Sequence, residues 1–261
     1  MKNKYIIISV FIILIFNRLL NYIYNFIVDG NFSISDNYIV KIVEKSILVL
    51  SVMLVIYLNK INFKLKITLR NVIILVVTVL LSYYSFDSIF TYLQEQEIQV
   101  SENQVLIFLI FCLSVGLFEE LLFRVFVFKS IFRSNNNLMK STFIASLFFA
   151  FAHLGNLFNP DYFVFSVIIQ IIFAFGIGFL LQSIFIKFNN LSIPIFIHGM
   201  INFFGSYKSR FLVYNNTEIS DSYELSRFIT SLIFVSVLSF IFIVIGKVII
   251  KSSKQFKKQS T

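Results

Sequence analysis

Long, almost uninterrupted runs of apolar residues restrict the possible folds of this chain more than any other feature. Hydrophobic residues make up 58% of its 261 residues, and charged residues only 13%. Soluble globular chains are typically about 45–50% apolar and about 25% charged. A run of about 20 apolar residues is long enough to cross the hydrocarbon core of a bilayer as a helix. The composition therefore predicts an all-α membrane protein and excludes a disordered, collagen-like or disulfide-rich secreted chain.

The apolar runs predict a polytopic bundle of about eight transmembrane helices. The predicted spans are residues 5–28, 38–58, 71–90, 104–128, 141–158, 162–186, 191–206 and 228–250. The first run follows two lysines but is long and lacks a small-residue cleavage pattern. We therefore expect it to be retained in the protein as a membrane span.

The charges of the connecting loops predict the orientation of the bundle. Basic residues without any acid occur in the loops 59–70, 129–140 and 187–190 and in the tail from 251. Acidic residues occur in the alternate loops 29–37, 87–103 and 159–161, and the loop 207–227 is mixed. Because Lys and Arg favour the cytoplasmic side, both termini are predicted to be cytoplasmic. The formal net charge of +9 is thus interpreted as membrane topology, and no nucleic-acid partner is expected.

We divide the chain into three segments. Residues 1–103 hold the first predicted helices, and their role is unassigned. Residues 104–206 contain the polar residues that lie within predicted spans and form the expected functional core. Residues 207–261 hold the last outside loop, the last helix and a basic cytoplasmic tail.

Two adjacent glutamates and an arginine lie within one predicted span, in the stretch Glu119-Glu120-Leu-Leu-Phe-Arg124. Ionisable residues inside a membrane are costly and are therefore candidates for function. Glu120 and Arg124 are four residues apart and can pair on one helix face, so they can also have a structural role. Glu119 points about 100° away and needs a partner on another helix.

Two later spans carry the only histidines, His153 and His198. His198 shares a helix face with Asn202, because these two residues are four apart. Each histidine alone could be an interhelical hydrogen-bonding residue. However, Glu119, His153, His198 and Asn202 all lie about 10–18 Å from the inner ends of their spans, at ~1.5 Å per residue. The spans can therefore bring these side chains together in one polar pocket.

The three motifs, Glu-Glu-x-x-x-Arg, Phe-x-x-x-His and His-x-x-x-Asn, resemble those of the CPBP intramembrane proteases. This family, also called Abi, contains CAAX prenyl endopeptidases and bacteriocin-processing enzymes. The resemblance covers about residues 104–206 and implies an eight-helix membrane peptidase with a buried site. By position it implies that Glu119 activates water beside His153.

The same resemblance implies that His198 and Asn202 stabilise the oxyanion, whereas Glu120 and Arg124 complete the site or hold its geometry. Such residues supply a base and oxyanion donors for peptide hydrolysis. The expected partners are membrane lipid and a peptide or protein substrate, which could be prenylated or carry a leader. The expected location is the plasma membrane, as a multi-pass protein.

The need for a metal is left open. Glu119, His153 and His198 form a set of two histidines and one glutamate, which binds zinc in many catalytic sites. The HExxH motif is absent, and a metal-free mechanism that uses the glutamate and histidines is equally compatible with these residues.

Two other functions are also open. A bacteriocin-immunity or regulatory membrane protein could keep this fold without catalysis. A transporter could use the same residues as a proton relay, but it would normally show repeat symmetry and broken helices in both halves, which this sequence lacks.

Overall fold

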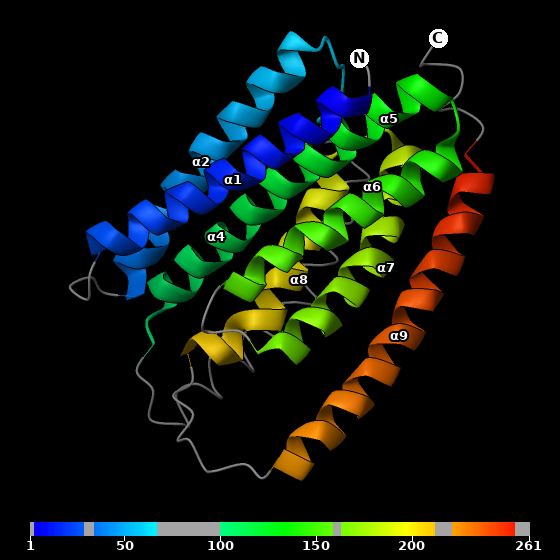
Figure 1. The fold of residues 1–261 in the computed structure, drawn as a ribbon. Coiled ribbons are helices and arrows are strands. Elements are labelled where there is room, and N and C mark those ends of the chain that lie inside the picture. Colours follow the sequence, from blue (N-terminus) through cyan, green and yellow to red (C-terminus); the bar gives the residue numbers. More distant parts are fainter. Residues whose placement is uncertain (1–2, 29–33, 67–99, 159–162, 212–220, 254–261) are drawn as a thin grey trace.

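The computed structural model describes residues 3–28, 34–66, 100–158, 163–211 and 221–253. Within these ranges the chain is helical, without strands, and its helices form a bundle (Figure 1). The elements are α1 (Asn3–Val28), α2 (Ile34–Leu58), α4 (Glu102–Glu120), η1 (Leu121–Val127), α5 (Phe128–Asn135), α6 (Leu138–Ala152), η2 (His153–Phe158), α7 (Val164–Phe188), α8 (Ser192–Phe211) and α9 (Asp221–Lys251).

Four helical stretches of the described residues are long and apolar enough to cross a membrane. They are Glu102–Asn135, Leu138–Phe158, Val164–Phe188 and Phe228–Lys251. This confirms an all-helical chain with membrane-spanning character. The predicted spans 5–28, 38–58 and 191–206 are not among these four stretches, and the predicted span 71–90 lies outside the described residues. The count of eight and the cytoplasmic termini therefore stay predictions. The division into three segments also stays a prediction.

Local sequence explains where the helices of the functional core begin and end. Ser101 caps α4 by accepting a hydrogen bond from the Gln104 backbone nitrogen, and the Gln104 side chain accepts one from the Ser101 backbone. This reciprocal pair is a capping box. Asn137 caps α6 through its side chain. Asn136 and Asn189 end α5 and α7 in the left-handed conformation, with φ of 49° and 46°, which asparagine tolerates well.

A π-helical segment, η1, joins α4 to α5 without a break in the helix. Every residue of η1 is buried. Short π-helical insertions often occur at functional sites. Here the insertion begins directly after Glu120 and contains Arg124, so the helical geometry changes from α to π at these two charged residues.

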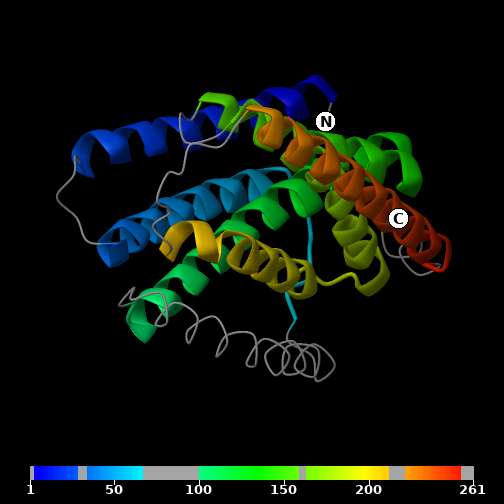
Figure 2. The same cartoon turned by 90° about the horizontal axis from the view of Figure 1, so that it is seen from below.

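The helix α4 packs against α2 on one side and α8 on the other (Figure 2). A glycine on each partner permits the close approach of α4 and α8. A Cβ atom on Gly116 would lie 2.9 Å from the Ile195 carbonyl oxygen, and one on Gly199 would lie 2.6 Å from Leu113 Cδ2. Neither glycine could gain a side chain without displacing the neighbouring helix.

The helix α9 stands at the edge of the bundle, where it packs mainly on α7 (Figure 1). Gly176 of α7 lies against Ser239, and Gly246 of α9 lies against Phe179. Only 6% of the apolar window of α9 is buried. Its large apolar side chains therefore face outward, as expected for a helix in contact with lipid.

Candidate active site

The two glutamates at the end of α4 lie in different environments. The Glu120 side chain is completely buried, whereas the Glu119 side chain is 23% exposed. This difference follows from the rotation of about 100° between successive helical residues. Glu120 faces the interior of the bundle, and Glu119 lies where a small molecule can approach it.

Arg124 holds Glu120 through two hydrogen bonds. Arg124 Nε donates to Glu120 Oε2 at 2.8 Å, and Arg124 Nη2 donates to Glu120 Oε1 at 3.1 Å. Both side chains are fully buried. Such bidentate pairing fixes the orientation of both groups. Removal of either partner would leave an uncompensated charge in the bundle, which typically costs about 3–5 kcal/mol.

His198 of α8 connects the two glutamates. Its Nδ1 hydrogen-bonds to Glu120 Oε1 at 2.9 Å, and its Nε2 lies 3.6 Å from Glu119 Oε2. Its neighbour Gly199 is one of the glycines that permit α8 to approach α4. The ring is therefore anchored at one nitrogen and presents the other towards Glu119.

Phe149 lies at the centre of the site. Its ring contacts the His153 and His198 rings edge-on, with centroid distances of 5.2 and 5.6 Å. The Arg124 guanidinium carbon lies 4.8 Å from the Phe149 centroid. Gly178 of α7 leaves room for this phenyl ring, because a Cβ there would lie 2.8 Å from Phe149 Cδ1. One phenyl ring thus holds three of the expected site residues in place.

His153 begins η2 directly after α6, and its Nδ1 hydrogen-bonds to the Phe149 carbonyl oxygen at 3.0 Å. When Nδ1 carries the hydrogen, Nε2 is available as an acceptor. His153 joins the site through Phe149 rather than through a direct bond to Glu119 in the described residues.

Asn202 lies one helical turn after His198, on the same face of α8, and is half-buried. Within the described ranges its side chain forms no hydrogen bond. The structure thus links Glu119, Glu120, Arg124 and His198 directly, adds His153 through Phe149, and places Asn202 next to them along α8.

No group of three or more His, Cys, Asp or Glu side chains among the described residues is arranged to hold a metal ion. Glu119, His153 and His198 therefore do not fit together as one ligand set as they are placed. The sequence left a divalent metal and a metal-free mechanism as alternatives, and a chelation experiment distinguishes them.

The first two helices contain further charged residues that were not among the expected site residues, and three of them, Arg18, Glu44 and Lys45, form polar contacts inside the bundle. Lys45 Nζ donates to Asn17 Oδ1 at 2.8 Å and pairs with Glu44 Oε1 at 2.9 Å. Lys45 also lies 5.9 Å from the ring of Phe118, the residue before Glu119.

Arg18 is the third of these residues, and its Nη2 donates to Asn156 Oδ1 of η2 at 3.1 Å. The rule that charges in spans are functional candidates applies equally to Arg18, Glu44 and Lys45, because all three lie within predicted spans.

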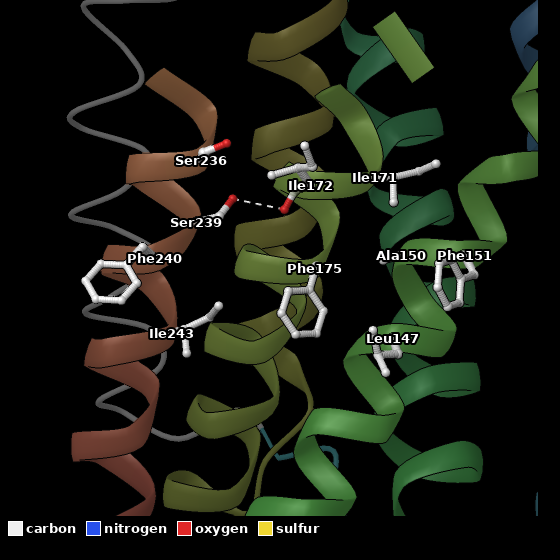
Figure 3. Close-up of a pocket in the computed structure, with 10 residues that line it drawn as sticks. All are labelled: Leu147, Ala150, Phe151, Ile171, Ile172, Phe175, Ser236, Ser239, Phe240 and Ile243. Carbon is white, nitrogen blue, oxygen red and sulfur yellow. Dashed lines mark hydrogen bonds between the residues drawn. The ribbon is translucent and has the colours of Figure 1, made fainter. Parts of the chain in front are cut away.

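An apolar groove between α6, α7 and α9 has a volume of about 370 Å³ (Figure 3). On its wall, Ser239 Oγ donates to the Ile172 carbonyl oxygen at 2.9 Å. Leu147 and Phe151 of α6 line the groove. They are each two residues from Phe149 and so point to the opposite side of the helix. The groove is therefore separate from the charged site.

The fold and this charged cluster define an integral membrane protein of apolar helices with acid–base groups inside its bundle. Residues 101–204 match the family model described as type II CAAX prenyl endopeptidase, Rce1-like. This segment is similar to Rce1-like endopeptidases, which is consistent with the CPBP family that the three motifs resemble. All six expected site residues lie within it, and this protease family supports a hydrolase. No curated protein and no solved structure matches the chain.

Proposed function

We propose that this protein is an intramembrane endopeptidase that hydrolyses a peptide bond of a membrane-associated protein or peptide. One observation supports this function best. His198 is anchored by the buried Glu120–Arg124 pair and presents its second nitrogen 3.6 Å from the partly exposed Glu119. A carboxylate beside a fixed imidazole can move a proton and stabilise developing charge in the same place.

In the proposed reaction, the Glu119 carboxylate removes a proton from a water molecule. The resulting hydroxide attacks the carbonyl carbon of the peptide bond, and the carbonyl oxygen becomes an oxyanion. His198 acts as the imidazolium: its Nδ1–H donates to Glu120, and its Nε2–H donates to this oxyanion. The Asn202 amide donates a second hydrogen bond to the oxyanion. Glu119 then passes its proton to the leaving nitrogen as the carbon–nitrogen bond breaks. The products are a new carboxyl end and a new amine.

The other residues hold these groups in position. Glu120 and Arg124 fix the His198 ring, since the pair is buried and bidentate. His153 assists beside Glu119, because its ring is held against Phe149 and its Nε2 is available to accept a hydrogen bond from water. Positioned groups of this kind lower the barrier by reducing the reorganisation that the reaction requires.

The setting of the reaction is also part of the proposal. We expect a multi-pass protein of the plasma membrane with about eight spans and cytoplasmic termini. The substrate class is a membrane-associated peptide, prenylated or leader-bearing, and the lipid bilayer is the second partner.

The test compares peptide termini in cells that express wild type, Glu119→Ala or the control Glu102→Ala. Glu102 is exposed in the first turn of the same helix, so its loss leaves the site intact. Mass spectrometry of membranes and medium should reveal new termini with wild type and Glu102→Ala but not with Glu119→Ala. Identical termini in all three, at equal protein levels, would instead favour a non-catalytic immunity or regulatory protein.

A further inference from the structure

Arg124 has a nitrogen that the Glu120 pairing does not use. Nε and Nη2 both donate to Glu120. Nη1 is buried and has no hydrogen-bond partner among the described residues. A guanidinium nitrogen always carries hydrogen, and an unpaired donor inside a protein is costly. Something that accepts a hydrogen bond is therefore required beside Nη1.

Gln182 is another buried residue whose polar atoms have no partner among the described residues. It lies in the apolar helix α7 and is fully buried. Neither its Oε1 nor its Nε2 has a partner within the described ranges. A glutamine amide can accept at the oxygen and donate at the nitrogen. Gln182 thus carries the acceptor that Arg124 Nη1 needs.

The packing of α7 places Gln182 on the face of this helix that is directed towards Arg124. Gly178, one turn before it, abuts Phe149, whose ring lies against the Arg124 guanidinium. Phe185, on the same face one turn after Gln182, packs edge-on against Phe128 with centroids 6.4 Å apart. Phe128 itself is four residues after Arg124. Gln182 therefore lies on α7 between Gly178 and Phe185, whose contacts lie on either side of the helical turn that contains Arg124.

Thr142 of α6 is a further residue of this kind in the same part of the bundle. Its hydroxyl is buried without a partner among the described residues, and it lies two turns before Phe149 on the same face of α6. Among the unpaired atoms of Arg124, Gln182 and Thr142, hydrogen-bond donors and acceptors are equal in number. Two are donors, Arg124 Nη1 and Gln182 Nε2, and two can accept, Gln182 Oε1 and Thr142 Oγ1.

We propose that Gln182 is a positioning residue of the site and that a buried water molecule joins it to Arg124. The water accepts a hydrogen bond from Arg124 Nη1 and donates one to Gln182 Oε1, and it brings Thr142 within reach as a third partner. A buried water with two to four polar partners is a normal structural element of proteins. Through Arg124 and Glu120, Gln182 fixes the His198 ring.

The first experiment measures thermal unfolding in detergent and does not depend on protease activity. If Gln182 had no hydrogen-bond partner, its replacement by apolar methionine of similar shape would stabilise the protein, and the melting temperature would rise. If Gln182 holds Arg124, Gln182→Met should instead lower it by about 3 °C or more. When Arg124 is already lysine, which has no equivalent of Nη1, Gln182 is left without its partner, and the same change should raise the melting temperature.

Ser183→Ala is the matched control, since Ser183 is the next residue, is equally buried and bonds to the Phe179 carbonyl oxygen. Its effect should be equal in both backgrounds. A raised melting temperature for Gln182→Met in the wild-type background, or an equal loss in both backgrounds, would overturn the proposal. If Gln182→Met does not accumulate in cells, the folding of the variant Gln182→Glu tests the proposal instead. A carboxylate beside Arg124 should be tolerated, whereas one without a partner should prevent folding.

The catalytic consequence rests on the proposed function. At equal protein levels, Gln182→Met should slow the formation of the wild-type termini by about tenfold, and Ser183→Ala should not. If wild type itself forms no termini, the proposed protease function fails, while the unfolding experiment still decides whether Gln182 holds Arg124. If Gln182→Met leaves the rate unchanged in an active protein, Gln182 is not a positioning residue.

Discussion

Glu119 and Glu120 are neighbours in sequence, yet their surroundings suit them to different tasks. Glu120 is fully buried and bonded to Arg124 and His198, so its oxygens are committed to holding other groups. Glu119 is partly exposed, and among the described residues the His198 nitrogen lies 3.6 Å from its Oε2. The division assigns proton transfer to Glu119 and positioning to Glu120.

Substitution of each glutamate by glutamine should separate these roles. Glu119→Gln should reduce the rate of terminus formation by about 10²–10⁴-fold, since the base is lost, with little change in the melting temperature. Glu120→Gln should lower both, because Arg124 is left buried without its counter-charge, at a cost of about 3–5 kcal/mol. The rate and the unfolding temperature of each purified variant provide the check. Equal unfolding temperatures for the two variants would contradict the assignment.

Phe149 offers a second prediction for a single residue. It touches His153, His198 and Arg124, so Phe149→Leu should decrease activity more than its loss of packing would suggest. As a comparison, Phe179→Leu removes an equally buried ring of α7 that packs near α9. Both variants should be destabilised to a similar degree, but only Phe149→Leu should lose most of its terminus formation. Equal rates in the two variants would remove Phe149 from the site.

The metal question also concerns single side chains. We expect activity to survive treatment with a strong chelator, because Glu119, His153 and His198 are not arranged as one ligand set among the described residues. The measurement is the rate of terminus formation before and after chelation. Loss of activity that added Zn²⁺ restores would show that a metal draws these side chains together.

Among the elements, the close contact of α4 and α8 determines whether the site forms at all. Gly116→Ala would place a Cβ 2.9 Å from the Ile195 backbone oxygen, and backbone cannot move aside cheaply. We expect a loss of about 1–3 kcal/mol in stability and a larger fractional loss of activity, since His198 would move from Glu120.

Gly205→Ala is the control on α8, because beyond its own helical turn no atom of the described residues lies within 4 Å of a Cβ at that position. This variant should keep wild-type activity, and alanine should slightly favour the helix. Unfolding curves and rates for both variants test the role of the helix contact. Normal activity in Gly116→Ala would show that the contact is not required.

The elements also show why only part of the site could be predicted from sequence. The i, i+4 spacing correctly paired Glu120 with Arg124, because that relation is local to one helix. The bond between His198 and Glu120 depends on the approach of α4 and α8 at Gly116 and Gly199, which no local pattern reveals. The π-helical turn after Glu120 was not predicted, because π-helices have no distinct hydrophobic period.

The importance of Phe149 was hidden for a related reason. In sequence, Phe149 is only the first residue of the Phe-x-x-x-His motif. Its contacts are to site residues of three other elements, His153 of η2, Arg124 of η1 and His198 of α8. Gln182 had no signal other than being a polar residue in an apolar helix. At the level of the helices, apolar run length predicted the four stretches that are long and apolar enough to cross a membrane, because that property is set by membrane thickness.

For the whole molecule, loop charges predict that the start of α4 faces outward and the end of α9 faces the cytoplasm. A cysteine introduced at Glu102 should react with a membrane-impermeant maleimide on intact cells. A cysteine introduced at Ser252 should react only after the cells are permeabilised. The native Cys112 is buried and provides a low background. The opposite labelling pattern would reverse the orientation, and equal labelling would show a miscounted span.

The most direct measurement incubates membranes that contain wild type or Glu119→Ala in H₂¹⁸O and examines newly formed peptide carboxyl ends by mass spectrometry. Hydrolysis by an activated water must place one ¹⁸O atom in each new carboxyl group, whichever peptide is the substrate. We predict ¹⁸O-labelled ends from one or a few membrane-associated precursors with wild type, and none of these with Glu119→Ala at equal protein levels. The same labelled ends with both proteins, or none with wild type, would contradict a protease that uses Glu119 to activate water.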